Sequence, residues 1–239
     1  METLAEGAIF VADAHHQEGS PHLPCLLDGL IANPPPQFFL MGDIFQILMG
    51  SVRSSYEPHA LILEQLRVLS QKSTLFYLEG NHDMGLRYWQ GLAQHAQIYP
   101  RNCQPLAFSY QDKTYLLAHG DLFLGWGYEL YIRLLSNRLS CKILGFLDRI
   151  RQLYPYIARP IKKKKIREWH LSPADWICFK QERLKHYHKG VCGKEGVIEG
   201  HFHIQNAPQD SLYCPLPAFY CTKQIATFTP KGLVISTIP

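Results

Sequence analysis

Five short apolar runs, spread over most of the chain, constrain its fold more than any other feature. Each run has the length of a strand and is rich in β-branched or aromatic residues, which is typical of buried strands. Each is followed directly by a polar or glycine-containing loop. The runs are residues 8–12, 37–41, 74–79, 114–118 and 196–199.

Helical patterns lie between the first of these runs. Ser20 and Pro21 open a predicted helix that reaches Ala32 and ends at Asn33, which three prolines follow. Residues 57–72 space their leucines three and four apart, which predicts a second amphipathic helix. The alternation of strands and helices predicts a layered α/β fold with the sheet inside.

The C-terminal part of the chain has a different pattern. Residues 218–237 predict successive strands, with Pro230, Lys231 and Gly232 as a hairpin turn. These strands favour a mixed sheet over a purely parallel one.

Residues 122–190 predict a long helical insertion, so the core domain would consist of residues 1–121 and 191–239. Between Arg133 and Lys189 stand fifteen Lys or Arg and four Asp or Glu, a local charge of +11 in a chain of +4, which leaves −7 for the remainder. This asymmetry indicates that the insertion faces something anionic, whether phosphate, nucleic acid or a lipid surface.

Composition excludes several classes of protein. With 239 residues, 46% hydrophobic and 18% charged, the chain predicts one globular domain. No run is long enough to span a membrane, and the acidic start lacks a signal-peptide pattern. The seven cysteines are scattered without a CxxC pair, which argues against a disulfide framework and a thiolate zinc site. A cytoplasmic protein with reduced cysteines is therefore expected.

Potential metal ligands follow every one of the five apolar runs. A histidine pair such as His201 and His203, taken alone, more often belongs to a polar loop than to a metal site. However, the carboxyl ends of strands meet at one crevice in open α/β sheets, so these residues are expected to converge. On an extended segment, two residues spaced i, i+2 point to the same side, so each such pair could hold a metal. The residues are Asp13 and His15, Asp43, Asn81 and His82, His119, and His201 and His203.

The ligand types predict two divalent ions. Carboxylate, imidazole and amide groups without thiolate suit Mn²⁺ best, with Fe or Zn as alternatives. If Asp43 is shared between the ions, a residual positive charge remains, which would favour binding of a phosphate anion.

The motifs also carry a resemblance to a known family. In chain order they resemble the calcineurin-like metallophosphoesterase superfamily, over about residues 8–205. That resemblance implies a four-layer α/β/β/α sandwich with mixed sheets and a metal-dependent hydrolase. The motifs are Asp13-Ala14-His15, Gly42-Asp43-Ile44-Phe45-Gln46, Gly80-Asn81-His82-Asp83, His119 and Gly200-His201-Phe202-His203.

Carried over position by position, the family implies one metal held by Asp13, His15, Asp43 and His203. A second would be held by Asp43, Asn81, His119 and His201, with Asp43 as the bridge. His82 and Asp43 would be the catalytic residues, and His82 and Asn81 would contact the phosphoryl group. Many members have an acid at the position of Gln46, where it orients the catalytic histidine; the neutral amide here could position His82 without raising its basicity. A phosphate-positioning role of His82 is therefore favoured over a general acid.

Within the superfamily, residues 116–123 and the insertion look like the UDP-2,3-diacylglucosamine pyrophosphohydrolases of lipid A biosynthesis, although that branch commonly has Arg where His82 stands. The resemblance implies cleavage of this nucleotide-linked glycolipid to UMP and 2,3-diacylglucosamine 1-phosphate. Apolar residues of the insertion would line an acyl-chain groove, or simply pack on the core. Tyr128, Lys162, Lys165 and Arg167 would bind substrate or an anionic membrane surface. The enzyme would be cytoplasmic and peripherally bound to the inner face of the membrane.

Two other interpretations stay open. One is a phosphodiesterase or nucleotide pyrophosphatase that acts on a soluble nucleotide or nucleic acid, although nucleic acid is not the expected partner. The other is a scaffold that kept the fold and lost the reaction, against which the intact ligand set argues. The sequence indicates no obligate protein partner.

Overall fold

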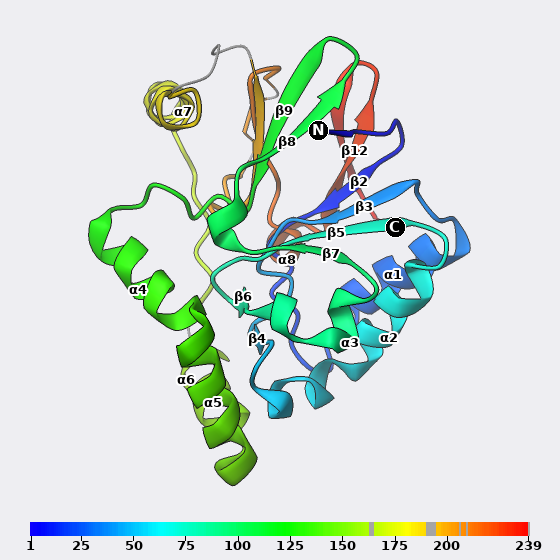
Figure 1. Ribbon diagram of the computed structural model, residues 1–239. Coiled ribbons are helices and arrows are strands. Elements are labelled where there is room, and N and C mark those ends of the chain that lie inside the picture. Colours follow the sequence, from blue (N-terminus) through cyan, green and yellow to red (C-terminus); the bar gives the residue numbers. More distant parts are fainter. Residues whose placement is uncertain (163–164, 190–194, 206, 209, 239) are drawn as a thin grey trace.

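Two mixed β-sheets stacked face to face form the centre of the computed structural model (Figure 1). The structure describes residues 1–162, 165–189, 195–205, 207–208 and 210–238. The first sheet has six strands. In spatial order they are β13 (Gly232–Thr237), β12 (Gln224–Thr229), β2 (Ile9–Val11), β3 (Gln37–Leu40), β5 (Thr74–Leu78) and β7 (Gln97–Tyr99).

In this sheet β2, β3, β5 and β7 are parallel, and β12 and β13 form an antiparallel hairpin at one edge. The second sheet has five strands, with β9, β10 and β11 parallel and β8 antiparallel to β9. In order they are β1 (Glu2–Thr3), β8 (Leu106–Tyr110), β9 (Lys113–Ala118), β10 (Gly196–Glu199) and β11 (Tyr213–Pro215). A small parallel pair, β4 (Leu48–Met49) and β6 (Asp83–Met84), lies beside them.

Three apolar clusters separate four layers. Phenylalanines fill the space between the sheets, where Phe39 stacks on Phe10 and Phe76 with ring centroids 4.5 and 4.6 Å away. Helices α1 (His22–Ala32) and α2 (Ala60–Leu69) cover the outer face of the first sheet with their leucines. Helix α7 (Pro173–Tyr187) covers the outer face of the second. The predicted α/β/β/α fold with mixed sheets is confirmed.

The described residues of the predicted insertion contain four helices, which pack in two places. Helices α4 (Trp126–Ser136), α5 (Arg138–Arg151) and α6 (Tyr154–Lys162) form an arm that extends from the sheets (Figure 1), whereas α7 belongs to the sheet packing. The arm is attached through an apolar cluster that joins it to β4 and β6. The proposed boundaries at 122 and 190 stay a prediction.

The structure corrects one element of the C-terminal part. Residues 219–222, predicted as strand, form the short helix α8 (Phe219–Thr222). The N–H groups of Phe219 and Tyr220 donate to the carbonyls of Ala12 and Asp13, so the chain turns across the end of β2 instead of running beside it. The predicted hairpin at 230–232 is confirmed by the pairing of β12 with β13.

Short helical turns connect the main elements. They are η1 (Arg53–Ser55), η2 (Glu57–His59), η3 (Leu86–Tyr88), α3 (Gln90–Ala93) and η4 (Arg101–Cys103). Six cysteines lie in the described part of the chain, and all six are free thiols. None of the described helices combines the length and the hydropathy that a membrane span requires.

Candidate metal centre

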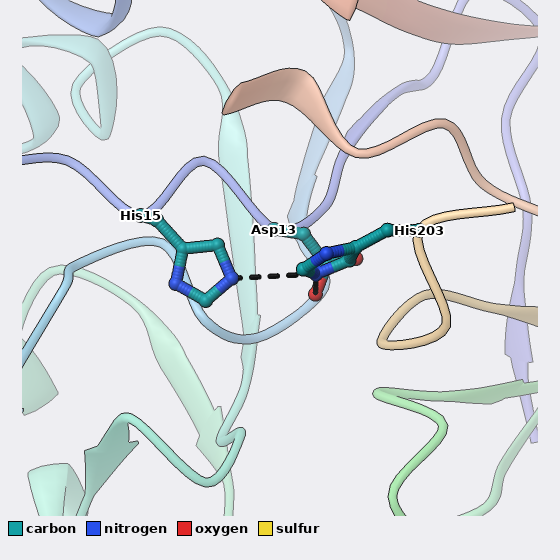
Figure 2. Close-up of side chains that lie close together, drawn as sticks. All are labelled: Asp13, His15 and His203. Carbon is teal, nitrogen blue, oxygen red and sulfur yellow. Dashed lines mark hydrogen bonds and ion pairs between the residues drawn. The ribbon is translucent and has the colours of Figure 1, made fainter. Parts of the chain in front are cut away.

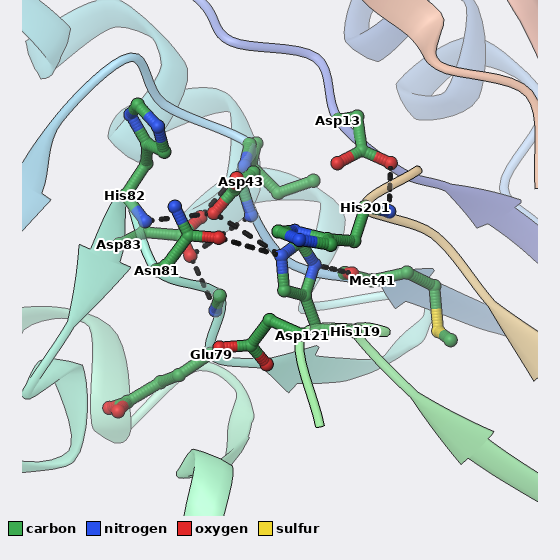
Figure 3. Close-up of polar contacts among 12 residues, drawn as sticks. Asp13, Met41, Asp43, Glu79, Asn81, His82, Asp83, His119, Asp121 and His201 are labelled. Atoms are coloured by element: carbon green, nitrogen blue, oxygen red, sulfur yellow. Dashed lines mark hydrogen bonds and ion pairs between the residues drawn. The ribbon is translucent and has the colours of Figure 1, made fainter. Parts of the chain in front are cut away.

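The predicted ligands converge at one end of the two sheets. Asp13 follows β2, Asp43 follows β3 and Asn81 follows β5 in the first sheet. His119 follows β9, while His201 and His203 follow β10, in the second sheet. Because the two sheets face each other, their strand ends bring these residues within contact distance (Figures 2 and 3).

The backbone at these positions is left-handed, which overturns the expectation of extended segments. The φ angles are +50° at Asp13, +40° at His15, +51° at Asp43, +71° at His201 and +49° at His203. Non-glycine residues rarely adopt this conformation, and it concentrates at functional sites. The histidine pair of the last motif is therefore split, with His203 beside Asp13 and His201 beside Asp43, and does not clasp one position.

Asp13, His15 and His203 form the first group of potential ligands (Figure 2). The Nε2 atoms of His15 and His203 lie 3.3 Å apart, and His203 Nε2 is 3.3 Å from Asp13 Oδ1. His203 Nδ1 donates to the carbonyl of Arg167, which leaves its Nε2 lone pair directed at the group. Asp13 Oδ1 is buried and accepts no hydrogen bond from the described residues.

Asp43, His119 and His201 form the second group (Figure 3). His119 Nδ1 donates to the carbonyl of Met41 at 2.9 Å, so its Nε2 faces Asp43 Oδ1 at 3.5 Å. Asn81 Oδ1 lies 3.4 Å from the same Nε2. The other oxygen of Asp43, Oδ2, is 4.0 Å from His15 Nε2 in the first group. Asp43 thus faces both groups, as a shared ligand requires.

Glycines allow these side chains to lie so close to the backbone. A Cβ on Gly80 would lie 2.3 Å from Asp43 Oδ1, and one on Gly200 would lie 2.6 Å from Asp13 Oδ2. A Cβ on Gly42 would lie 2.4 Å from the ring of His119. The glycines directly before Asp43, Asn81 and His201 therefore allow this close approach.

Electrostatics at the site favour a bound cation. Burial disfavours a charged imidazole at His119, but the carboxylates of Asp43 and Asp121 outweigh it and raise the pKa of His119 to about 9. Burial lowers the pKa of both His15 and His201 to about 4, which keeps these imidazoles neutral. Buried carboxylates and neutral imidazoles with free lone pairs are the donor set of a divalent metal site. The residues present therefore fit two ions, one per group.

Asp83 supports the site without belonging to either group, a role that the sequence analysis did not assign. Its carboxylate accepts from the N–H groups of Asp43, Ile44 and Gly80 and from the hydroxyl of Tyr77. Burial, with the charge of Asp43, raises the pKa of Asp83 to about 7, while these donors favour its ionised form. The side chain holds the loops after β3 and β5 together. The position of Asp83 directly after Gly80-Asn81-His82 is the sequence feature that could have indicated this role.

Arg183 of α7 joins the two loops that carry the ligands of the second sheet. Its guanidinium makes a bidentate pair with Glu199 at 2.8 and 2.6 Å. It also donates to the carbonyls of Gly120 and Leu122 in the loop after His119. The side chain is only 4% exposed. The sequence does not distinguish Arg183 from the many exposed basic residues of the insertion, so its structural role could not be predicted.

Arg101 forms a second buried link, at the root of the arm. It binds the Asp121 carboxylate at 2.7 Å and both oxygens of Glu129 in α4 at 2.7 Å. Tyr128, predicted to bind substrate, donates to Asp121 at 3.1 Å. The first turn of α4 is thereby held next to the loop that carries His119.

His82 forms a third group of potential ligands with His15 and Asp43, and its ring lies 4.9 Å from that of His15. Its Nδ1 donates to the main-chain carbonyl of Gln46 at 2.7 Å. The Gln46 side chain instead donates to the carbonyl of Ile161. Thus the expectation that the Gln46 amide positions His82 is wrong, because the backbone of the same residue performs that role.

The basic residues predicted to bind substrate lie at the end of the arm and on the segment that follows it. Lys165 and Arg167 are exposed, and Arg167 adjoins the metal centre through its contact with His203. Lys162 ends α6, and its side chain lies outside the described residues. Their assignment as substrate ligands stays a prediction.

Comparison with known proteins identifies the family. The sequence model of the calcineurin-like phosphoesterases matches residues 8–205. No curated protein matches the chain.

Several solved structures are similar in fold. An uncharacterized protein of Streptococcus pneumoniae, described as a predicted phosphoesterase, is 12% identical, covers 94% of this chain and 83% of its own, and has a TM-score of 0.40. YfcE, a phosphoesterase from E. coli, is 12% identical over 97% of this chain and 91% of its own, with a TM-score of 0.44. A dimetal phosphatase from Danio rerio is 14% identical over 98% and 99%, with a TM-score of 0.44.

The assignment depends on the family model, which covers all five motifs and most of the chain. The chain belongs to the calcineurin-like phosphoesterase family and is a metal-dependent phosphoester hydrolase.

Proposed function

We propose that the enzyme cleaves the pyrophosphate of UDP-2,3-diacylglucosamine and releases UMP and 2,3-diacylglucosamine 1-phosphate. The observation that carries this proposal is the apolar surface of the arm. Large apolar side chains that gather on an exposed segment often bind a lipid or a partner. Its most exposed members are Trp126 (81%), Leu139 (68%), Phe146 (63%), Ile150 (63%) and Tyr156 (71%).

The position of the arm next to the metal centre supports a substrate that contacts both the metal centre and the arm. Helix α4 begins beside the metal centre, where Arg101 joins Glu129 to Asp121. A pyrophosphate at the metal centre would therefore leave attached acyl chains next to α4 and α5. Lys165 and Arg167 would neutralise phosphate charge at the other side of the site.

Each residue of the centre has a role in this reaction. Two divalent ions would be held by Asp13, His15 and His203 and by Asn81, His119 and His201, with Asp43 between them; they would supply Lewis-acid charge to the phosphoryl oxygens. His82 contacts a phosphoryl oxygen and orients it, held by the Gln46 carbonyl. Asp83, Arg183 and Arg101 hold the loops in place.

The excess of basic residues in the insertion supports a peripheral position on an anionic membrane. The enzyme would act at the cytoplasmic side of the membrane, where a nucleotide and a lipid can meet. Exposed apolar side chains next to exposed basic ones suit the interface between head groups and acyl chains.

The test is hydrolysis of the lipid substrate by purified protein loaded with Mn²⁺, followed by phosphorus NMR. UMP should appear from UDP-2,3-diacylglucosamine in detergent. UDP-N-acetylglucosamine is the matched control. It has the same pyrophosphate but no long fatty-acyl chains, so it should react much more slowly. Absence of UMP with Mn²⁺, Fe²⁺ and Zn²⁺ would sink the proposal.

A second candidate is a phosphodiesterase that acts on a soluble nucleotide or nucleic acid. The observation that favours it is the alternation of exposed aromatic and basic residues on the arm, such as Tyr131 with Arg133 and Tyr156 with Arg159. Binding of single strands that weakens steeply with salt, together with equal rates on soluble and lipid substrates, would support this candidate.

A further inference from the structure

A cavity of about 1050 Å³ lies between α5 and the body of the protein, away from the metal ligands. One wall is the face of α5 that carries Arg138, Lys142 and Arg149. The opposite wall contains Arg53 of η1 together with the aromatic rings of Tyr56 and Trp89. Neither the proposed reaction nor the family motifs involve any of these residues.

The cavity is strongly cationic. Four basic side chains line it, and no acidic side chain does. Across the described ranges, none of the four forms an ion pair with an acidic group. Asp148, the one acid of α5, is buried and accepts from Ser54 and Leu153 instead. Arg53 and Arg149 also line a neighbouring pocket that contains acidic residues, but Arg138 and Lys142 do not. Four like charges that line one cavity without an ion-pair partner among the described residues favour binding of an anion there.

The walls of the cavity are held in place before any ligand binds. Gly145 lets α5 touch the body, since a Cβ there would lie 2.7 Å from the carbonyl of Ser51. Tyr56 stacks on Trp89 with ring centroids 3.9 Å apart, and its hydroxyl donates to the carbonyl of Gly50. A preformed site loses less entropy on binding than one that must order itself.

The cationic wall adjoins the exposed apolar surface on the same helix. Residues spaced three and four apart share one face of a helix, so Arg138, Lys142 and Arg149 lie together. The next face around α5 carries the exposed side chains of Leu139, Ile143, Leu147 and Ile150. Phe146 borders both, because it lines the cavity and is 63% exposed.

We propose that this cavity binds the phosphate head group of an anionic phospholipid in the membrane, with the acyl chains of that lipid along the apolar face of α5. Guanidinium groups form bidentate hydrogen bonds with phosphate, and the adjoining apolar face matches the lipid tails. The site is separate from the metal centre and does not depend on which phosphoester is cleaved there. It anchors the arm at the membrane surface.

The test compares two variants with the same loss of charge. R138Q/K142Q/R149Q removes three cations of the cavity, and R133Q/R151Q/R159Q removes three exposed cations of the arm that do not line it. Binding is measured by co-sedimentation with vesicles of phosphatidylethanolamine and phosphatidylglycerol, at about 0.15 M salt. We expect the cavity variant to bind at least about tenfold more weakly and the matched variant within about twofold of wild type. Equal losses would overturn a specific site.

A second measurement separates a lipid head group from free phosphate. Inorganic phosphate and glycerol 3-phosphate are added at millimolar concentration, and Trp89 fluorescence is followed against a W89F background. A saturable change in wild type that the cavity variant lacks would assign the site to soluble phosphate and overturn the lipid proposal. No change, with vesicle binding intact, supports it.

Hydrolysis of a soluble phosphodiester keeps this test apart from the proposed function. The cavity variant should retain wild-type rates, because its changed residues are exposed and remote from the metal ligands. If circular dichroism shows that the triple variant does not fold, K142Q/R149Q replaces it. We expect this double variant to lose part of the vesicle binding. Unchanged vesicle binding of the double variant would contradict the proposed site.

Discussion

The side chains of the metal centre are buried and held by contacts within the protein, whereas many side chains of the α4–α6 arm are exposed to solvent. At the centre, Asp13, Asp43 and His119 are at most 2% exposed, and backbone or side-chain contacts hold the surrounding loops. On the arm, Trp126 is 81% exposed and Leu139 is 68% exposed, without neighbours that cover them. The protein itself holds the donor atoms of the centre in place, whereas the apolar side chains of the arm are open to solvent.

This difference separates the region that carries the hydrolytic site from the region for which we propose lipid binding. Chemistry needs ligands in fixed positions, and the closely packed strand ends supply them. Attachment to a lipid needs an apolar surface that stays open to solvent until the lipid arrives. The predictions below probe each region, from the largest expected effect to the smallest.

Removal of the shared ligand should have the largest effect. We expect Asp43→Ala to lower kcat by about a thousandfold or more, because a metal at a phosphoryl oxygen contributes several kcal/mol to transition-state stabilisation. Metal content by elemental analysis should fall below two ions per chain. Asp112→Ala, in an exposed turn, is the control and should keep full activity. Full activity of Asp43→Ala would show that the site is wrongly assigned.

Loss of the buried link between the loops should come next. Arg183→Met leaves the buried Glu199 carboxylate without its cationic partner and, among the described residues, with only the hydroxyls of Tyr187 and Tyr213 as donors, so the free energy of unfolding should fall by about 3–5 kcal/mol. Urea unfolding measures this. Lys185→Met, exposed on the same helix, should change it by less than about 0.5 kcal/mol. In the double variant R183M/E199Q the free energy of unfolding should fall by less than the sum of the falls in the two single variants. If the two effects simply add, the pairing of Arg183 with Glu199 is contradicted.

His82 distinguishes phosphate positioning from acid catalysis. We expect His82→Gln to lower kcat/KM by about a hundredfold, and equally for phosphodiesters with good and poor leaving groups, because a positioning contact does not depend on the leaving group. Gln46→Met should keep most activity, since the carbonyl that orients His82 remains. A loss confined to poor leaving groups would instead assign His82 as the general acid.

The surface of the arm should show the smallest effect on the protein itself. L139Q/I143Q/L147Q should leave the free energy of unfolding nearly unchanged, while hydrolysis of a lipid substrate in vesicles falls about tenfold. Leu144→Ala, on the packed face of the same helix, should instead cost about 2 kcal/mol. If L139Q/I143Q/L147Q unfolds as easily as Leu144→Ala, the exposed face is part of the core.

The sequence alone determined the main strands and the residues at their ends. Runs such as 37–41 and 196–199 are apolar enough to be buried wherever they lie, and a polar residue directly after them must lie at the strand end. The order of the motifs along the chain indicated the family. Strands β1, β7, β8 and β11 escaped prediction because they are short or only partly buried, and pairing with longer strands stabilises them.

The family resemblance already assigned His203 and His201 to different ions, but only the tertiary structure shows how the backbone separates them. The left-handed backbone at His201 and His203 directs the two imidazoles to different neighbours, and such angles depend on the loops packed around them rather than on spacing. The same holds for Arg183 and Arg138, which are both basic residues of the insertion. One is buried against Glu199 and the other lines an open cavity, because burial and pairing depend on elements far away in the sequence.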